Sequence, residues 1–200
     1  MTVQFVTMSR SGHHLLVRLI KQARPEITYC EYYRPEGCCR SIPCTKGVDF
    51  QKSHDFGLNE PIDPARRYII QIRDPMESIA SHYEIDVAER SWKKRGPDIA
   101  MVWRRFARKQ IKHRIGFYAK WAQTPPPLAL VIRYLDLVSD PLGTVDLISR
   151  FVWGEPARHF AAEPIKATRR VEDFRHYDMA FFADLSALAA KSCQSWNRLK

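Results

Sequence analysis

The stretch VQFVTMSRSGHHLLVRLI, residues 3–20, combines a strand, a polar turn and a helix. Its first five residues, Val3–Thr7, form an apolar run that predicts a buried strand. The turn Met8–Gly12 follows, and leucine and isoleucine then recur at helical spacing, which predicts a helix from near His13 to Ala23. A helix that begins directly after a strand offers unbonded N–H groups and the positive end of its dipole. The stretch therefore predicts an anion site for a phosphate or a sulfate.

The turn itself carries side chains that suit an anion. Arg10 supplies a cation, Ser11 a hydroxyl donor, and Gly12 can adopt a left-handed conformation or let a ligand approach the backbone. The alternative is an ordinary strand–turn–helix unit that binds nothing. The nucleotide-binding pattern GxxxxGK[ST] is absent, because the turn has one glycine, and His13 and His14 stand where a magnesium-binding hydroxyl is needed.

Length, composition and charge limit the remaining possibilities. The 200 residues, 45% of them hydrophobic, predict one globular domain spanning residues 1–200. No apolar run approaches the ~20 residues that cross a membrane, and no signal peptide is recognisable, so we expect a cytoplasmic protein without a transmembrane segment. The net charge of +10 favours an anionic partner. Much of it lies in residues 93–95 and in the helix expected at about 98–123, which equally fits a solvated basic face.

Four of the five cysteines fall in an irregular insertion at about residues 30–49. They are Cys30, Cys38, Cys39 and Cys44, whereas Cys193 stands alone. Their spacing contains no CxxC unit, which makes the pattern a weak indicator of zinc. We expect reduced thiols, with a metal site or disulfides as the alternatives.

Strands alternate with helices along the chain. Short strands are expected at Glu26–Tyr29, Phe50–His54, Arg67–Ile72 and Leu128–Tyr134, and helices after Asp74-Pro75 and at about 98–123, 142–152, 157–162 and 179–191. This alternation predicts an α/β fold of three layers, αβα, with a mainly parallel central sheet. The carboxyl ends of such strands are the usual place for a ligand.

Two further stretches carry candidate chemistry at strand ends. Arg73 follows the Arg67–Ile72 strand, and Ser81 lies about two turns into the next helix, so the two could bind an anion beside that helix. Alternatively, Asp74 caps the helix and Arg73 pairs with a carboxylate. His54 ends another strand, where it could act as a general base at neutral pH.

Taken together, these stretches resemble the sulfotransferases that use 3′-phosphoadenosine 5′-phosphosulfate (PAPS). The resemblance rests on an ordered set of motifs: Ser9–His14, Lys52–His54, Arg73–Ser81, Arg133–Leu137, and a basic loop with Arg169 and Arg170 before Asp173–His176. Departures include Arg10 where lysine is usual, and His13-His14 in place of hydroxyl residues. The resemblance implies a P-loop NTPase-like topology.

The resemblance also implies roles for individual residues. His54 would be the general base, Arg10 would stabilise the leaving group, and Lys52 is a second candidate near the acceptor. The nucleotide would be bound by Arg10, Ser11, Gly12, His13, His14, Arg73, Ser81, Tyr134, Arg169 and Arg170. The scheme requires no metal.

The acceptor implied by the resemblance is a hydroxyl or amine of a saccharide, a lipid-linked saccharide or a small metabolite. No nucleic-acid partner is expected, because no recognisable nucleic-acid motif appears. Two alternatives stay open. They are a P-loop-like nucleotide kinase and a non-catalytic basic module that binds nucleic acid or acidic polysaccharide.

Overall fold

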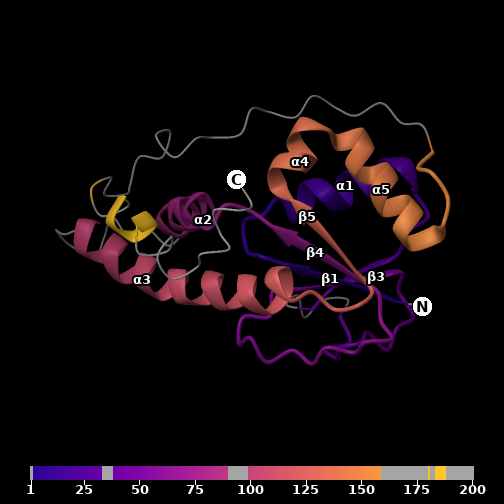
Figure 1. Ribbon diagram of the computed structural model, residues 1–200, viewed down its shortest axis with the longest axis horizontal. Coiled ribbons are helices and arrows are strands. Elements are labelled where there is room, and N and C mark those ends of the chain that lie inside the picture. Colours follow the sequence, from indigo (N-terminus) through magenta and orange to yellow (C-terminus); the bar gives the residue numbers. More distant parts are fainter. Residues whose placement is uncertain (1, 33–37, 90–98, 159–179, 181–182, 188–200) are drawn as a thin grey trace.

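The computed structural model describes residues 2–32, 38–89, 99–158, 180 and 183–187 (Figure 1). Its core is one sheet of five strands: β1 (Val3–Thr7), β2 (Tyr29–Glu31), β3 (Phe50–Ser53), β4 (Tyr68–Ile72) and β5 (Ala129–Arg133). The order is β2-β3-β1-β4-β5 and every neighbouring pair is parallel. The sequence-based expectation of a parallel α/β sheet is confirmed, with β1 at its centre.

Helices cover both faces of this sheet. They are α1 (His13–Ala23), α2 (Pro75–Glu89), α3 (Ile99–Phe117), the π-helical segment η2 (Tyr118–Gln123), α4 (Tyr134–Ser139) and α5 (Pro141–Trp153). Figure 1 shows α1, α4 and α5 above the sheet and α3 below it. None of the described helices is long and apolar enough to cross a bilayer.

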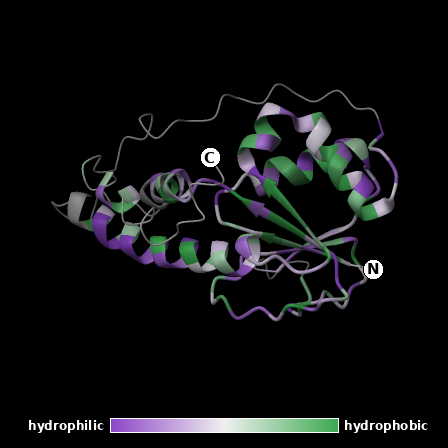
Figure 2. Cartoon of the chain, viewed as in Figure 1, coloured by the Kyte–Doolittle hydropathy of each residue, from purple (hydrophilic) through white to green (hydrophobic). Residues whose placement is uncertain are grey.

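The pleat of β1 explains how two apolar layers form from one strand. Val3 and Phe5 pack into the core beneath α1 and α5, whereas Val6 packs with Trp121 of η2 in a second core on the other face. Successive side chains of a strand point to opposite faces, and both faces are covered here, so all five residues of β1 are buried. Figure 2 shows the same pattern as hydrophobic strands between amphipathic helices.

Several expected element bounds differ from those observed. The second strand lies at Tyr29–Glu31, not Glu26–Tyr29, because pairing with β3 begins at Tyr29. The strand expected to end at His54 ends one residue earlier, the strand expected at Leu128–Tyr134 is one residue shorter at each end, and α4 begins at Tyr134. The helix expected at about 98–123 changes to π-helix at Tyr118.

The C-terminal elements fall largely outside the described residues. Ala157 and Arg158 are not helical, and the rest of the helix expected at 157–162 is not described. Residues 180 and 183–187 are helical, in agreement with part of the helix expected at 179–191. One domain spanning residues 1–200 stays a prediction.

Candidate functional site

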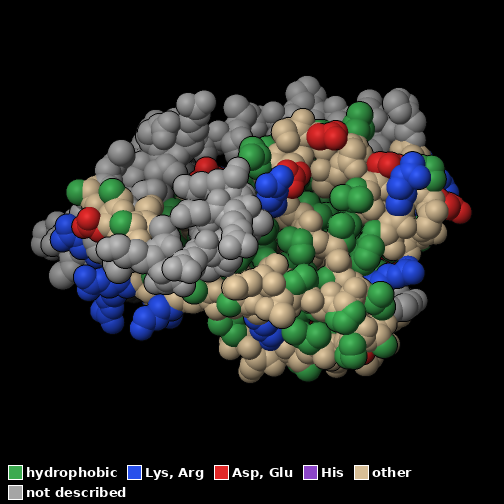
Figure 3. Space-filling model, viewed as in Figure 1, with side chains coloured by type: hydrophobic (Ala, Val, Ile, Leu, Met, Phe, Trp, Pro, Cys, Tyr) green, Lys and Arg blue, Asp and Glu red, His purple; other side chains and the backbone are tan. Residues whose placement is uncertain are grey.

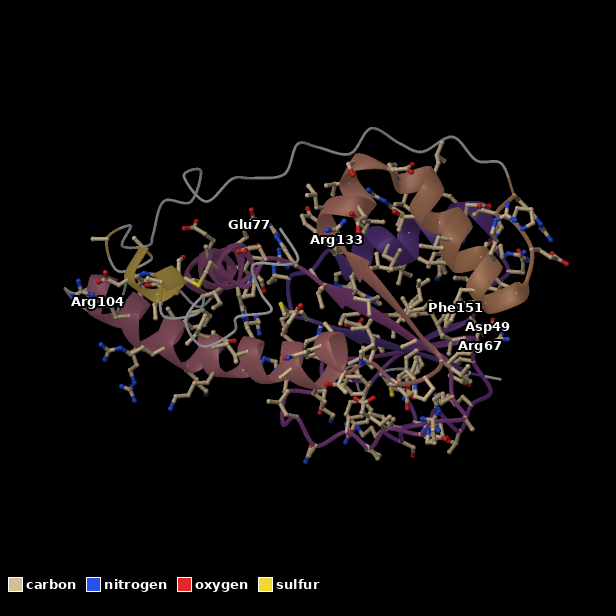
Figure 4. All side chains as sticks on the ribbon, in the orientation of Figure 1. Asp49, Arg67, Glu77, Arg104, Arg133 and Phe151 are labelled. Carbon is tan, nitrogen blue, oxygen red and sulfur yellow. The ribbon has the colours of Figure 1, made fainter. Side chains whose placement is uncertain are left out.

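Most of the predicted site residues that the structure describes gather near the carboxyl ends of the strands. Figure 4 labels Asp49 and Arg67, which precede β3 and β4, near one edge of the sheet. Glu77 and Arg133, which follow β4 and end β5, lie near the opposite edge. The turn after β1 starts at this second edge, because β1 runs parallel to both neighbours.

The turn Met8–Gly12 is held by its carbonyl groups. Each of the five carbonyl oxygens accepts a hydrogen bond from within the protein; in chain order the donors are Ser11 N (3.1 Å), Ser78 Oγ (2.6 Å), Arg73 Nη1 (3.3 Å), Gln71 Nε2 (2.8 Å) and Leu16 N (3.1 Å). The carbonyl dipoles are therefore directed into the structure. No side chain caps α1, whose N-cap is Gly12. An anion at this turn would meet N–H groups of the first helical turn rather than carbonyl oxygens.

Gly12, Tyr134 and Arg73 form a compact stack beside the turn. A Cβ built on Gly12 would lie 2.5 Å from ring carbons of Tyr134. The Arg73 guanidinium carbon lies 4.4 Å from the centre of the same ring, which is cation–π geometry. The turn after β1, the residue after β4 and the start of α4 are thereby brought into contact.

Replacing Gly12 by alanine is expected to lower the thermal midpoint, because φ is +85° and the added methyl group would overlap the Tyr134 ring. Gly154→Ala is a matched control, since Gly154 has a φ of +77° with nothing within 4 Å of an added Cβ. Both variants carry the backbone cost of about 1 kcal/mol. Thermal unfolding should show a further loss of about 1–3 kcal/mol for Gly12→Ala alone. Equal losses in the two variants would contradict the packing of Gly12 on Tyr134.

Arg10 and Ser81 also meet in this region. Arg10 Nε donates to Ser81 Oγ across 3.3 Å. Arg10 is exposed and has a φ of +65°, a left-handed conformation that is uncommon for arginine. The two residues expected to hold opposite ends of a nucleotide are thus one hydrogen bond apart.

The alternative expectation, in which Asp74 caps the helix and Arg73 pairs with a carboxylate, is also confirmed. Asp74 Oδ1 accepts the backbone N–H groups of Met76 and Glu77, each at 3.0 Å, and so caps α2. Arg73 Nε donates to Glu77 Oε2 across 3.1 Å. The pairing with Glu77 leaves Arg73 beside the turn, since its Nη1 donates to Arg10 O.

His54 lies one residue after β3 and is anchored to the last residue of β1. Its Nδ1 lies 2.7 Å from the carbonyl oxygen of Thr7. Because a carbonyl only accepts, Nδ1 carries the ring proton and Nε2 carries the lone pair. Neutral His54 can therefore accept a proton at Nε2, and its anchor is three residues from Arg10.

No family model matches the sequence, and no curated protein matches it at a significant level. A sulfotransferase from Alicyclobacillus acidocaldarius has a similar structure, with a TM-score of 0.52 at 16% identity, covering 98% of this chain and 99% of that one. The chain has a sulfotransferase fold. A sulfotransferase domain from the curacin biosynthetic pathway aligns with a TM-score of 0.45 at 13% identity, over 86% of this chain and 82% of that one.

The sulfotransferase fold confirms the α/β class and the P-loop-like topology. It leaves the role of each site residue as a prediction, because likeness at this level of identity concerns the arrangement of the backbone. Arg169 and Arg170, which were expected to close over the nucleotide, lie outside the described residues.

The electrostatic setting of His54 is unusual. Burial is the main reason that its pKa is lowered to about 3, and the nearby cation of Lys52 adds to this effect. The hydrogen bond to Thr7 opposes the shift. Since the charged form is disfavoured, His54 is neutral, and able to accept a proton, throughout the physiological pH range.

We expect the His54 ring to keep its Nδ1–H tautomer and to remain uncharged between about pH 8 and pH 5, a range in which an imidazole in water gains its proton. Ring nitrogen and carbon shifts, followed by NMR across this range, measure the protonation directly. The signal missing from a His54→Asn variant identifies the residue among the seven histidines. A midpoint near pH 6.5 would show that the ring is solvated and not anchored as observed.

Three other predicted residues take positions that the sequence did not indicate. Lys52 was expected to be a candidate near the acceptor or a solvated lysine, but it is 3% exposed and its Nζ lies 2.5 Å from Glu31 Oε1. His13 is buried, and its Nε2 lies 2.6 Å from the hydroxyl of Tyr29, so this ring nitrogen already has a partner. His14 is exposed. Because its ring nitrogen is bonded to Tyr29, His13 would contribute its backbone N–H, and not its side chain, to an anion at the turn.

Arg114 is a site residue that sequence reasoning missed. It was grouped with the solvated cations of the basic helix, yet its exposed fraction is 0%. Its Nε donates to Ser78 Oγ across 3.1 Å. Within the described part of the chain, no carboxylate pairs with it, and burial lowers its pKa to about 10. A buried cation close enough to lower the pKa of His54 favours an anionic ligand beside the histidine.

Asp55 is a second missed residue, and it fixes the loop that carries His54. Its carboxylate is 1% exposed and accepts from Lys120 Nζ (2.7 Å), Trp121 Nε1 (2.9 Å) and the backbone N–H of Glu60 (2.9 Å). Asp55 has a φ of +40°, so these bonds hold a backbone conformation that is uncommon for residues other than glycine. They attach the loop after β3 to η2.

Proposed function

We propose that this protein is a PAPS-dependent sulfotransferase with His54 as its general base. The observation that carries the proposal is the convergence of Arg10, Gly12, Arg73, Ser81 and Tyr134, which come from three separate segments, at the strand edge where His54 is anchored. A cation, a hydroxyl, an aromatic ring and a helix N-terminus in one place match the parts of an adenine nucleotide with two phosphate groups.

Each part of the nucleotide has a chemically suitable partner. The N-terminus of α1 and Arg10 would hold the 5′-phosphosulfate, with backbone N–H groups of residues 12–14 as donors. Arg73 and Ser81 would hold the 3′-phosphate, for which a planar guanidinium offers two parallel donors. Arg169 or Arg170 would close over it, and Tyr134 would lie against the adenine. Binding would separate Arg10 from Ser81, replacing their hydrogen bond with charge-assisted bonds to the ligand.

The transfer step then follows from the tautomer of His54. Nε2 takes the proton of the acceptor hydroxyl or amine as its oxygen or nitrogen forms a bond to sulfur. The bond between sulfur and the bridging oxygen of the 5′-phosphate breaks, and the electron pair leaves with that oxygen. Arg10 and the α1 N-terminus stabilise the resulting charge, as in phosphoryl transfer. The anionic phosphate and sulfate groups of bound PAPS would also raise the pKa of His54 above its value in the ligand-free protein. His54 would then be a stronger base when the substrate is bound.

The described surface also bears on the acceptor. Figure 3 shows blue side chains beneath α3. The exposed cations of this helix form a basic face: Arg104, Arg105, Arg108, Lys109 and Lys112. The Phe56 ring is 53% exposed and lies 5.1 Å from the ring of His54. We propose a saccharide, lipid-linked saccharide or small metabolite as acceptor, with an acidic saccharide the best match to the basic face. A cytoplasmic location remains part of the proposal.

Nucleotide selectivity tests the donor half of this function. Isothermal titration should show that 3′-phosphoadenosine 5′-phosphate (PAP) binds more tightly than 5′-AMP, because only PAP places a phosphate at Arg73 and Ser81. Equal affinities would overturn the proposal. An acceptor screen with labelled PAPS tests the transfer itself. Binding of PAP without transfer to any acceptor class would leave a nucleotide-binding module and reject the enzyme.

A further inference from the structure

Four cysteine thiols gather beside the edge strand β2, away from the proposed nucleotide site. Cys30 belongs to β2, and Cys38, Cys39 and Cys44 lie in the segment that precedes β3. The sulfur atoms of Cys30, Cys39 and Cys44 all lie within 4.8 Å of one another. Cys38 Sγ is 3.1 Å from Cys30 Sγ, and Cys39 Sγ is 3.3 Å from Cys44 Sγ. All four are free cysteines.

These separations suit a tetrahedral metal site. Zinc binds thiolate sulfur at about 2.3 Å, which places the four sulfurs of a tetrahedron about 3.8 Å apart. The Cys30–Cys38 and Cys39–Cys44 pairs, at 3.1 Å and 3.3 Å, are somewhat closer than this, and the sulfurs of Cys30, Cys39 and Cys44 stay within 4.8 Å of one another. Side-chain rotations would therefore bring the sulfurs of Cys30, Cys39 and Cys44 around one ion, with Cys38, 3.1 Å from Cys30, as the fourth ligand.

The contacts form one group and not two separate pairs. Cys30 Sγ donates to Cys38 Sγ, and it also lies within 4.8 Å of the sulfurs of Cys39 and Cys44. Cys44 also contacts Cys39. Two disulfides would join each sulfur to a single neighbour at about 2.05 Å. The four sulfurs instead form one connected group, as the ligands of a single ion do.

Backbone N–H groups already point at two of the sulfurs. Arg40 N donates to Cys38 Sγ and Thr45 N donates to Cys39 Sγ, each at 3.3 Å. Such bonds favour the thiolate, which is the form that binds a metal, and they orient the ligand around the ion.

We propose that Cys30, Cys38, Cys39 and Cys44 bind one Zn²⁺ ion in a structural tetrathiolate site. Four sulfur ligands select zinc over the oxygen-preferring divalent ions and leave no open position for catalysis. The ion would fasten the segment that carries Ser41, whose carbonyl accepts from Gln51 of β3, to the edge of the sheet. It would also fix Glu31, the residue after Cys30, which pairs with Lys52 two residues before His54.

This site is independent of the proposed sulfuryl transfer, so its test does not use activity. The full chain is purified in reducing buffer without chelator, and metals are measured by plasma mass spectrometry. We expect one zinc per chain, released when a mercurial blocks the thiols. Cobalt exchanged into the wild-type protein should give the intense visible bands of a tetrahedral sulfur site. Iron in place of zinc would overturn the zinc assignment.

Variants separate the four cysteines from an adventitious site. Cys39→Ser combined with Cys44→Ser should lose the zinc, whereas Cys193→Ser, which changes the one cysteine outside the group, should keep it. The cobalt spectrum of the wild-type protein keeps the proposal testable if the double variant fails to fold. Zinc retained by a folded double variant, or wild-type protein that binds neither zinc nor cobalt while all thiols are reduced, would overturn it. Two disulfides that persist in reducing buffer would do the same.

Discussion

Replacing His54 by alanine is expected to lower kcat by about 10²–10⁴-fold, the range that a positioned general base contributes. The affinity for PAP should change by less than about threefold, because His54 contacts the acceptor and not the nucleotide in the proposed arrangement. Single-turnover transfer from labelled PAPS and isothermal titration with PAP measure the two quantities. The separation of the two effects distinguishes a base from a residue that merely supports the turn.

The anchor of His54 on Thr7 provides a matched control. An asparagine at position 54 keeps a side-chain N–H that can donate to the Thr7 carbonyl, but it has no basic nitrogen. We therefore expect His54→Asn to be as inactive as His54→Ala and at least as stable. If asparagine restores transfer, the role of His54 is to position the turn. If both variants lose PAP binding together with activity, the histidine is structural.

The positions of the candidate site residues could be predicted from sequence largely because they lie at strand ends, whereas their chemical roles stay predictions. Arg73 follows the apolar strand Tyr68–Ile72 and His54 follows the short strand Phe50–Ser53, and parallel pairing then brings both positions to the same edge of the sheet. The same reasoning failed for Lys52, because a residue at a strand end can lie on a covered or an open face. Only the pairing of β2 with β3 shows that Glu31 stands beside Lys52.

The burial of Arg114 has a signal in the sequence, which is its position within the apolar stripe of α3. Arg114 lies three residues after Ile111 and three before Phe117, both of which are buried, so it falls within the apolar stripe of α3 and not among the exposed cations. A count of the cations along α3 does not separate the buried Arg114 from the exposed arginines and lysines. A cation inside an apolar stripe is a better indicator of a site than the net charge of the helix.

The cysteine group and the bounds of the elements depended on information that spacing does not contain. Cys30 meets the other three thiols because β2 lies at the sheet edge beside the segment that returns to β3. Likewise, the β-rich run at Leu128–Tyr134 does not reveal that the chain turns into α4 at Tyr134. That turn places the Tyr134 ring over Gly12 and Arg73, which is the contact that completes the proposed nucleotide site.

Arg73→Ala is expected to weaken PAP binding by about 10–100-fold, since charge-assisted hydrogen bonds to a phosphate contribute about 1.5–3 kcal/mol. Binding of 5′-AMP should change little, so the preference for PAP should disappear. Arg133→Ala is a matched control. Arg133 is also an arginine at this edge, but it is exposed and pairs with Asp136 at 2.7 Å (Figure 4).

Arg73 also stacks on Tyr134 and supports the Arg10 carbonyl, so its loss could disturb the turn as a whole. Arg73→Lys separates these effects. Lysine keeps the charge but lacks the planar fork that can bind a phosphate with two parallel bonds, so PAP affinity should fall between those of the wild type and the alanine variant. Equal losses of PAP and 5′-AMP affinity in both variants would mean that Arg73 maintains the turn and that the 3′-phosphate is bound elsewhere.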